Sequence, residues 1–139
     1  MINLIVGTKG SGKTKTLINL INAAAKNTKG NVVCIEKGLK LTYDLDYSVR
    51  LVDIEQFGVS GFDAFYGFIA GILAGNYDIT HIFIDATLKI GGRDIAAFEN
   101  MVLKLVKLLT VHGAEITFTV SCDVSDIPED IKKYIISGK

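Results

Sequence analysis

The sequence contains no tryptophan, one proline and two cysteines in 139 residues, and its 15 basic side chains are balanced by 15 acidic ones. Proteins dedicated to nucleic-acid binding usually carry a basic excess, so a formal net charge of zero argues against that class. Cys34 and Cys122 lie far apart in a chain without a secretory signal. We therefore expect reduced thiols and a cytoplasmic protein.

Long apolar runs are also missing. The most apolar stretch, residues 62–73, is shorter than the roughly 20 residues that a membrane-spanning helix needs, and glycines interrupt it. Residues 1–6 have neither the basic region nor the small-residue cleavage site of a signal peptide. We expect no membrane span and no secretion signal.

Apolar runs alternate with helical patterns along the chain, and its length suits one domain over residues 1–139. Strands are predicted at 2–6, 31–36, 49–54, 81–85 and 115–121. Helices are predicted at 13–25, at 62–73, from the N-cap Asp94 to about His112, and as a short turn that begins at Pro128. This alternation indicates an α/β fold with about five mainly parallel strands and helices on both faces.

The loops that follow parallel strands meet at one edge of the sheet, because the crossovers are right-handed. Ligands bind at that edge, beyond the carboxyl ends of the strands. The candidate site segments are therefore 7–14, 36–48, 55–61, 85–94 and 121–128.

The first of these segments fits the phosphate-loop pattern G-x-x-x-x-G-K-[ST] in full. Glycines let the backbone wrap around an anion, and the wrapped N–H groups at the start of a helix form an anion nest. Every position is a predicted nucleotide contact: Gly7, Thr8, Lys9, Gly10, Ser11, Gly12, Lys13 and Thr14. Lys13 is expected to reach the β- and γ-phosphates, and the Thr14 hydroxyl is expected to ligate Mg²⁺.

On these residues, the chain resembles a P-loop NTPase over nearly its whole length and, more narrowly, short uncharacterised bacterial ATP-binding P-loop proteins. The resemblance implies a three-layer α/β/α domain that binds ATP or ADP with Mg²⁺. We favour the RecA-like strand order, in which another strand separates the strand before Gly7 from the strand that ends at Asp85. The kinase-like order stays open. Chromosome-partitioning ATPases carry a lysine directly after the first glycine, where this chain has Thr8.

The second acidic motif is the run His81-Ile82-Phe83-Ile84-Asp85, an apolar strand that ends in a carboxylate. This is the Walker B pattern, and it makes Asp85 the candidate acid for Mg²⁺. Asp53, which follows the shorter apolar run Leu51-Val52, is the alternative candidate for the Mg²⁺ acid. Asp85 is followed by Ala86, where many related ATPases carry a glutamate that polarises the attacking water. We therefore expect that hydrolysis is slow, or that another residue supplies the base. Glu36 and Glu55 are the candidates for that base, and the alternative is that both are surface acids without a catalytic role.

A polar strand face and a glycine loop also bear on the reaction. Thr117, Thr119 and Ser121 share one face of the last strand, where a polar residue can sense the γ-phosphate. Arg93 lies in a loop with Gly91 and Gly92, which we expect to be mobile and able to act on a phosphate of this subunit or of a partner.

The chain has only two arginines, Arg50 and Arg93, whereas kinases of small phosphoacceptors usually deploy several. We therefore expect an ATP-binding switch with weak or partner-dependent ATPase activity. A small-molecule or nucleotide phosphotransferase and a non-catalytic, nucleotide-gated interaction module are the alternatives. The helices at 62–73 and 94–112 are unusually apolar, which indicates burial on two sides or an interface with a partner or a second copy.

Overall fold

The computed structural model describes residues 1–138, and within them the backbone is built around a six-stranded, all-parallel sheet. In spatial order the strands are β3 (Arg50–Asp53), β2 (Asn31–Glu36), β4 (Ile79–Ile84), β5 (Glu115–Ser121), β1 (Ile2–Gly7) and β6 (Ile135–Gly138). β5 therefore lies between β1 and β4, where the sequence led us to expect an intervening strand.

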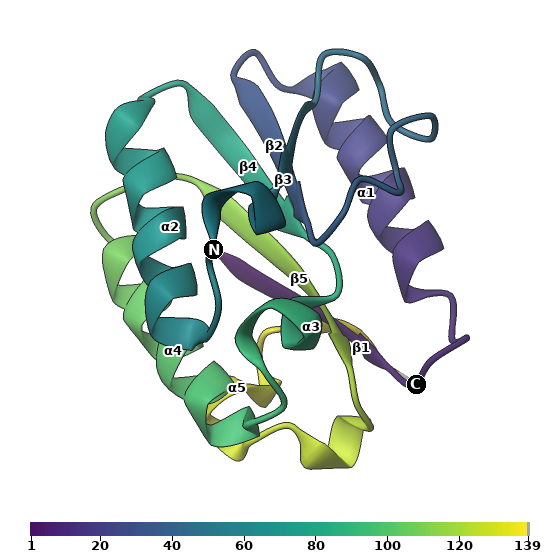
Figure 1. Ribbon diagram of the computed structural model, residues 1–139, viewed down its shortest axis with the longest axis vertical. Helices are drawn as coiled ribbons and strands as arrows, with labels where there is room; N and C mark the ends of the chain where they lie inside the picture. The colour runs from purple at the N-terminus through teal and green to yellow at the C-terminus, as the bar shows by residue number, and fades with distance from the viewer. Residues whose placement is uncertain (139) are drawn as a thin grey trace.

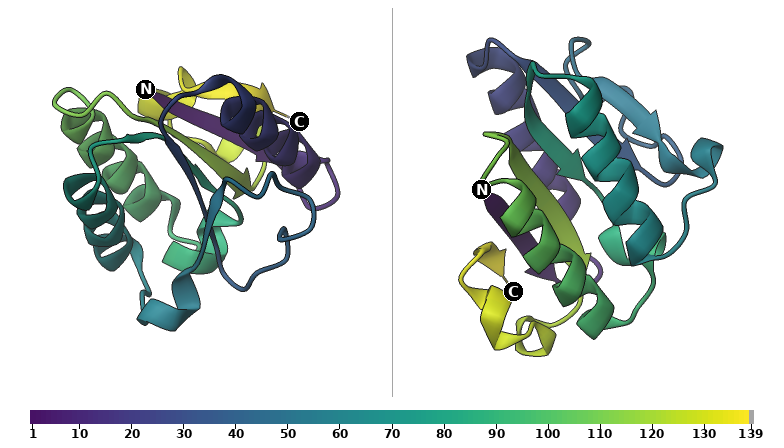
Figure 2. Two further views of the ribbon diagram at one scale, coloured as in Figure 1. Left: turned by 90° about the horizontal axis from the view of Figure 1, so that it is seen from above. Right: turned by 90° about the vertical axis from the view of Figure 1, so that its left-hand side faces the viewer.

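Helices cover both faces of this sheet, as Figures 1 and 2 show. Helix α1 (Lys13–Asn27) lies on one face. The helices on the other face are α2 (Phe62–Gly75), α3 (Thr87–Gly91), α4 (Ile95–Leu108) and α5 (Glu129–Lys132). The fold is thus α/β with helices on both sides of a parallel sheet, as the alternation of the sequence predicted.

The alternation of side chains along each strand divides the core in two. On β1, Leu4 and Val6 pack with the side chains of α2 and α4, whereas Ile5 packs with Leu17 and Ile21 of α1. On β5, the apolar side chains Ile116, Phe118 and Val120 face α2 and α4. The side chains of Glu115, Thr117, Thr119 and Ser121 therefore point to the α1 side of the sheet.

The helix α3 and the strand β6 are absent from the sequence prediction. The segment with Gly91 and Gly92 is not a free glycine loop, because it contains α3, whose Leu88 and Ile90 are buried. A Cβ atom at Gly91 would collide with the Phe62 ring, so this glycine serves close packing. After α5, whose N-cap is Pro128, the chain adds β6 beside β1, which gives six strands instead of about five.

Helix α4 begins after the cap Asp94, whose Oδ1 accepts from Ala97 N at 3.2 Å, and ends at Leu108, earlier than expected. Phe65, Ile69 and Leu73 of α2 are buried, whereas Phe68 and Ile72 are half-buried. The outward face of α2 carries exposed small residues, namely Ala64, Gly67, Gly71 and Ala74. α2 is therefore buried on one side only. The interface with a partner or a second copy stays a prediction. Within residues 1–138, none of the helices combines the length and the apolar character needed to cross a membrane.

Candidate functional site

A cleft of about 620 Å³ opens at the carboxyl ends of β1, β2, β4 and β5. Segments from four of the five predicted site regions meet in it, namely 7–14, 36–48, 85–94 and 121–128, together with Thr119 of β5. The lining residues are Thr8, Lys9, Gly10, Lys13, Thr14, Glu36, Lys37, Lys40, Leu41, Asp85, Ala86, Lys89, Arg93, Thr119, Ser121 and Cys122. The cleft lies where an open α/β sheet places its ligands.

The segment from Gly7 to Thr14 forms one wall of the cleft. Gly10 and Gly12 have φ angles of +85° and +89°, a left-handed conformation that favours glycine. A Cβ atom at Gly7 would collide with Ser11 Oγ, which is buried and has no hydrogen-bond partner among the described residues. Gly12 caps α1 without any side-chain hydrogen bond, so the first N–H groups of a 15-residue helix remain available to an anion.

Lys13 lies against this wall and donates from Nζ to the carbonyl oxygen of Thr8 at 3.2 Å. That contact holds the ammonium group at the mouth of the loop. Lys9 is exposed at the tip of the same loop and also lines the cleft.

Asp85 forms the opposite wall, and two hydroxyl groups converge on it. Its Oδ1 accepts from Thr119 Oγ1 at 2.8 Å and from Thr14 Oγ1 at 3.4 Å. Thr119 Oγ1 in turn accepts from the backbone N–H of Ala86 at 2.7 Å. Thr119, which is 1% exposed, thus fixes both the carboxylate and the peptide that follows it.

Ala86 adopts φ 57° and ψ 52°, and it is the only non-glycine residue with a positive φ among residues 1–138. An L-residue pays about 1–2 kcal/mol for this conformation. Strain of this kind persists only where the surroundings enforce it, and it clusters at functional sites. Here the Thr119 hydroxyl and the start of α3 impose the turn.

Glu36 ends β2 beside Asp85, and the structure corrects the view of it as a surface acid. The residue is only 3% exposed. Oε1 accepts from Lys40 N at 3.2 Å, while Oε2 has no partner among the described residues. Burial is the main cause that raises the pKa of this carboxyl, and the charge of Asp85 raises it further, against hydrogen bonds from the backbone of Lys40 and Leu41.

The charge of the cleft is strongly positive although the whole chain is neutral. Two carboxylates line it, against six cationic side chains: Lys9, Lys13, Lys37, Lys40, Lys89 and Arg93. Arg93 Nη2 donates to the Ser121 carbonyl at 3.3 Å, and Lys37 Nζ donates to the Lys89 carbonyl at 3.4 Å. Sequence reasoning missed Lys37, Lys40 and Lys89, because only the fold brings their loops together. Such a cleft attracts anions.

Several sequence candidates lie elsewhere. Asp53 accepts from Gly38 N at 2.9 Å and from Glu55 N at 3.1 Å, so it ends the edge strand β3 and caps the 3-10 helix Ile54–Phe57. Glu55 is exposed and does not line the cleft. Thr117 lies nearer the amino end of β5 and contacts Asn3, so only Thr119 and Ser121 of the predicted polar face reach the cleft.

Cys122 contributes a half-buried thiol to the cleft. Burial and, after it, the charge of Asp126 raise the pKa of this thiol, so it stays protonated at neutral pH. The pKa of the buried Cys34 thiol is also raised, chiefly by burial.

Residues 1–138 contain no group of three or more His, Cys, Asp or Glu side chains placed to hold a metal ion. Mg²⁺ bound together with a nucleotide needs fewer, because phosphate oxygens and water complete its coordination. The hydroxyl of Thr14 and the carboxylate of Asp85, 3.4 Å apart, fit that requirement. No protein-family model and no curated protein matches the sequence.

Proposed function

We propose that the protein is a P-loop nucleotide-binding protein that binds Mg·ATP in the cleft at the carboxyl edge of the sheet. One observation carries the proposal. The glycine-rich turn from Gly7 to Thr14 opens α1 directly opposite a strand-terminal carboxylate, in a cleft lined by six cationic side chains. Free N–H groups, an ammonium group and a carboxylate–hydroxyl pair suit a phosphate chain with its metal ion.

Each residue then has a definite task. The backbone N–H groups of 8–14 and the Lys13 ammonium hold the β- and γ-phosphates. Thr14 and Asp85 would hold Mg²⁺, and Thr119 keeps Asp85 oriented toward them. When bound, Mg²⁺ supplies charge neutralisation on the phosphate oxygens. Arg93 and the lysines at 37, 40 and 89 add positive charge around the remaining phosphate surface.

Glu36 is the candidate base for hydrolysis. The residue lines the cleft at the end of β2, beside β4 and the Asp85 that follows it, and its buried Oε2 has no hydrogen-bond partner among the described residues. A raised pKa makes a carboxylate a better proton acceptor for an attacking water molecule. The water oxygen would bond to the γ-phosphorus as the bond to the bridging oxygen breaks, and Glu36 would take the proton.

Turnover is expected to be slow. Ala86 offers no acid or base, and Glu36 is held from one side by Lys40. Arg93 is tethered to the Ser121 carbonyl, and it must leave that contact to approach a phosphate of this chain. A protein with these features acts as a nucleotide switch whose hydrolysis depends on a partner.

The first experiment measures Mg·ATP and Mg·ADP binding by calorimetry for the wild type, Lys13→Ala and the matched control Lys15→Ala. Lys15 lies two residues further along α1, is exposed, and does not line the cleft. Loss of hydrogen bonds between charged groups costs about 1.5–3 kcal/mol, which is roughly a 10- to 150-fold loss of affinity for Lys13→Ala. Wild-type protein that binds neither nucleotide contradicts the proposal.

The second experiment measures phosphate release, and nucleotide binding with and without Mg²⁺, for Asp85→Asn and Glu36→Gln, with Asp53→Asn as the control. Asparagine also caps helices, so Asp53→Asn keeps its structural contact and should retain full turnover. Asp85→Asn should weaken binding only when Mg²⁺ is present. Glu36→Gln should abolish phosphate release while nucleotide still binds. Binding without any turnover in the wild type would favour the interaction module, and phosphate transfer to an added metabolite would favour a phosphotransferase.

A further inference from the structure

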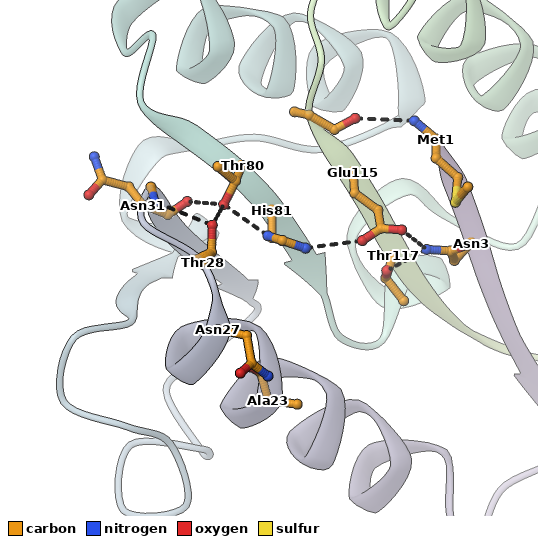
Figure 3. Close-up of polar contacts among 12 residues, drawn as sticks. Met1, Asn3, Ala23, Asn27, Thr28, Asn31, Thr80, His81, Glu115 and Thr117 are labelled. Carbon is orange, nitrogen blue, oxygen red and sulfur yellow. Dashed lines mark hydrogen bonds and ion pairs between the residues drawn. The ribbon is translucent and has the colours of Figure 1, made fainter.

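A second cleft, of about 540 Å³, lies on the α1 side of the sheet at the opposite, amino-terminal end of the strands. Its floor is formed by side chains of β1, β4 and β5, and its wall by the C-terminal half of α1. Figure 3 shows the side chains of His81, Glu115 and Asn3 reaching toward one another from these three strands above α1. The cleft is separate from the cationic cleft, since none of the residues lining it lines the other.

The floor of this cleft is unusual for a parallel sheet, whose strands are normally apolar on both faces. His81 pairs in register with Glu115, and Asn3 pairs with Thr117 on the neighbouring rung. Four polar side chains therefore occupy adjacent positions on a face that α1 should cover. The small side chains of Ala23 and Ala24 on α1 leave the space above them open. Polar side chains at positions where the fold favours apolar ones are expected at functional sites.

A chain of hydrogen bonds orients the imidazole of His81. Gly30 N donates to Thr28 Oγ1 at 3.2 Å, and the Thr28 and Thr80 hydroxyls lie 2.8 Å apart. Thr80 Oγ1 lies 2.9 Å from His81 Nδ1, and His81 Nε2 lies 3.1 Å from Glu115 Oε2. A carboxylate accepts hydrogen bonds, so the Nε2 that faces Glu115 is a donor, and Nδ1 lies against the Thr80 hydroxyl.

Glu115 is the only carboxylate among the described residues that line the cleft, and none of those residues is a lysine or an arginine. Oε2 accepts from His81, and Oε1 accepts from Asn3 Nδ2 at 3.2 Å. A carboxylate has about four lone-pair sites, so half of its capacity remains free. The side chain is 35% exposed toward the cleft opening. Leu20, Phe83 and Ile136 contribute apolar side chains to the lining.

We propose that this cleft is a second ligand site, which takes a small organic cation: an amine or amidine on a flat apolar body. The cationic group lies on Glu115, and the body lies against Leu20, Phe83 and Ile136. The volume is within the range of clefts that bind small molecules. The site is independent of nucleotide binding, and its charge preference is the reverse of that of the cationic cleft.

The test is a titration of the ¹⁵N-labelled full-length chain with benzamidine, followed by amide chemical shifts. Benzamide, which has nearly the same shape without the charge, is the matched ligand control. Saturable shifts are expected around Ala24, Phe83 and Thr117. Loss of a charge-assisted contact predicts about tenfold weaker binding of benzamide, and a similar loss for Glu115→Gln. Glu99→Gln, on α4 at the other face of the sheet, should bind as the wild type does.

Ala23→Phe fills the cleft from an exposed position on α1 and leaves Glu115 intact, so it tests the site even if Glu115→Gln does not fold. It should abolish the benzamidine shifts, whereas Lys13→Ala should leave them unchanged. The proposal is overturned if benzamide binds as well as benzamidine, if Ala23→Phe retains binding, or if the shifts map to the cationic cleft.

Discussion

Thr117 and Thr119 provide a controlled comparison, because both are buried threonines on the same face of β5, 2% and 1% exposed. Replacing either with valine removes a hydroxyl and preserves the shape of the side chain. In Thr119→Val, the Ala86 N–H loses its partner and Asp85 loses its nearest donor. A buried donor left unsatisfied costs about 1–3 kcal/mol, and the lost bond to a carboxylate adds about 1.5 kcal/mol or more. We expect a destabilisation of roughly 3 kcal/mol.

Thr117→Val should cost less. Thr117 Oγ1 accepts from Asn3 Nδ2 at 3.3 Å, and Asn3 keeps its other bond to Glu115. The N–H that Asn3 loses from Thr117 lies at an open cleft where water replaces the hydroxyl, so a loss of about 1 kcal/mol is expected. Urea unfolding followed by far-ultraviolet circular dichroism measures both values. Equal losses in the two variants would show that the hydroxyl of Thr119 does not hold the Asp85–Ala86 turn.

The variants Thr117→Val and Thr119→Val also separate an effect on stability from an effect on nucleotide binding. Thr119→Val should weaken the binding of Mg·ADP and leave the binding of metal-free ADP unchanged, because Thr119 acts through Asp85. Thr117→Val should change neither. Calorimetry with and without Mg²⁺ gives the four affinities. If Thr119→Val weakens the binding of metal-free ADP equally, then Thr119 supports the segment from Gly7 to Thr14 and has no specific role at the Asp85 carboxylate.

Three further outcomes are expected. The pKa of Glu36 is raised in the folded state by burial, so the stability that the protonated carboxyl contributes is present at low pH and is lost as pH rises through the folded pKa. Glu36→Gln should therefore gain stability over the wild type at pH 8 and little at pH 4, and an equal gain in urea unfolding at both values would contradict the burial of a charge. Gly12→Ala, at φ +89°, should lose about 1–2 kcal/mol and nucleotide affinity, whereas Gly71→Ala, on the open face of α2, should gain about 0.5–1 kcal/mol in thermal unfolding. Cys122 lines the cationic cleft, so Mg·ADP should slow its alkylation by a maleimide at pH 9, and an unchanged rate with saturating nucleotide would argue against binding there.

The strands that the sequence predicted well are those whose local pattern agrees with their burial. β5 begins and ends at the predicted residues, because its apolar side chains alternate with polar ones between clear boundaries. β6 has no comparable signal. Ile135–Gly138 is short, and it forms only because β1 offers an open edge, which is a tertiary property. α3 escaped prediction because Gly91 and Gly92 suggest a loop, while Leu88 and Ile90 gain burial only against the folded core.

The same distinction applies to the candidate site. Local spacing was enough to predict that Lys13, Thr14 and Asp85 share a cleft, because the motif lies at the ends of strands. The burial of Glu36 depends on the chain turning back at Lys40, which no periodicity encodes. The convergence of the lysines at 37, 40 and 89 depends on β2 and β4 being neighbours, and strand order is a property of the whole sheet.

The central position of β5 also limits how this protein can change in length. β5 pairs with β1 on one side and with β4 on the other, so Thr117 lies between Asn3 and Phe83. Because side chains alternate, inserting or deleting one residue ahead of Thr117 would turn the threonines into the α2–α4 core and aim phenylalanine and valine at Asp85 and His81. Residues 42–47, where Tyr43 and Tyr47 are fully exposed, pair with no strand. Related chains are therefore expected to vary freely in length there, and to keep the spacing of β5 even where its residues change.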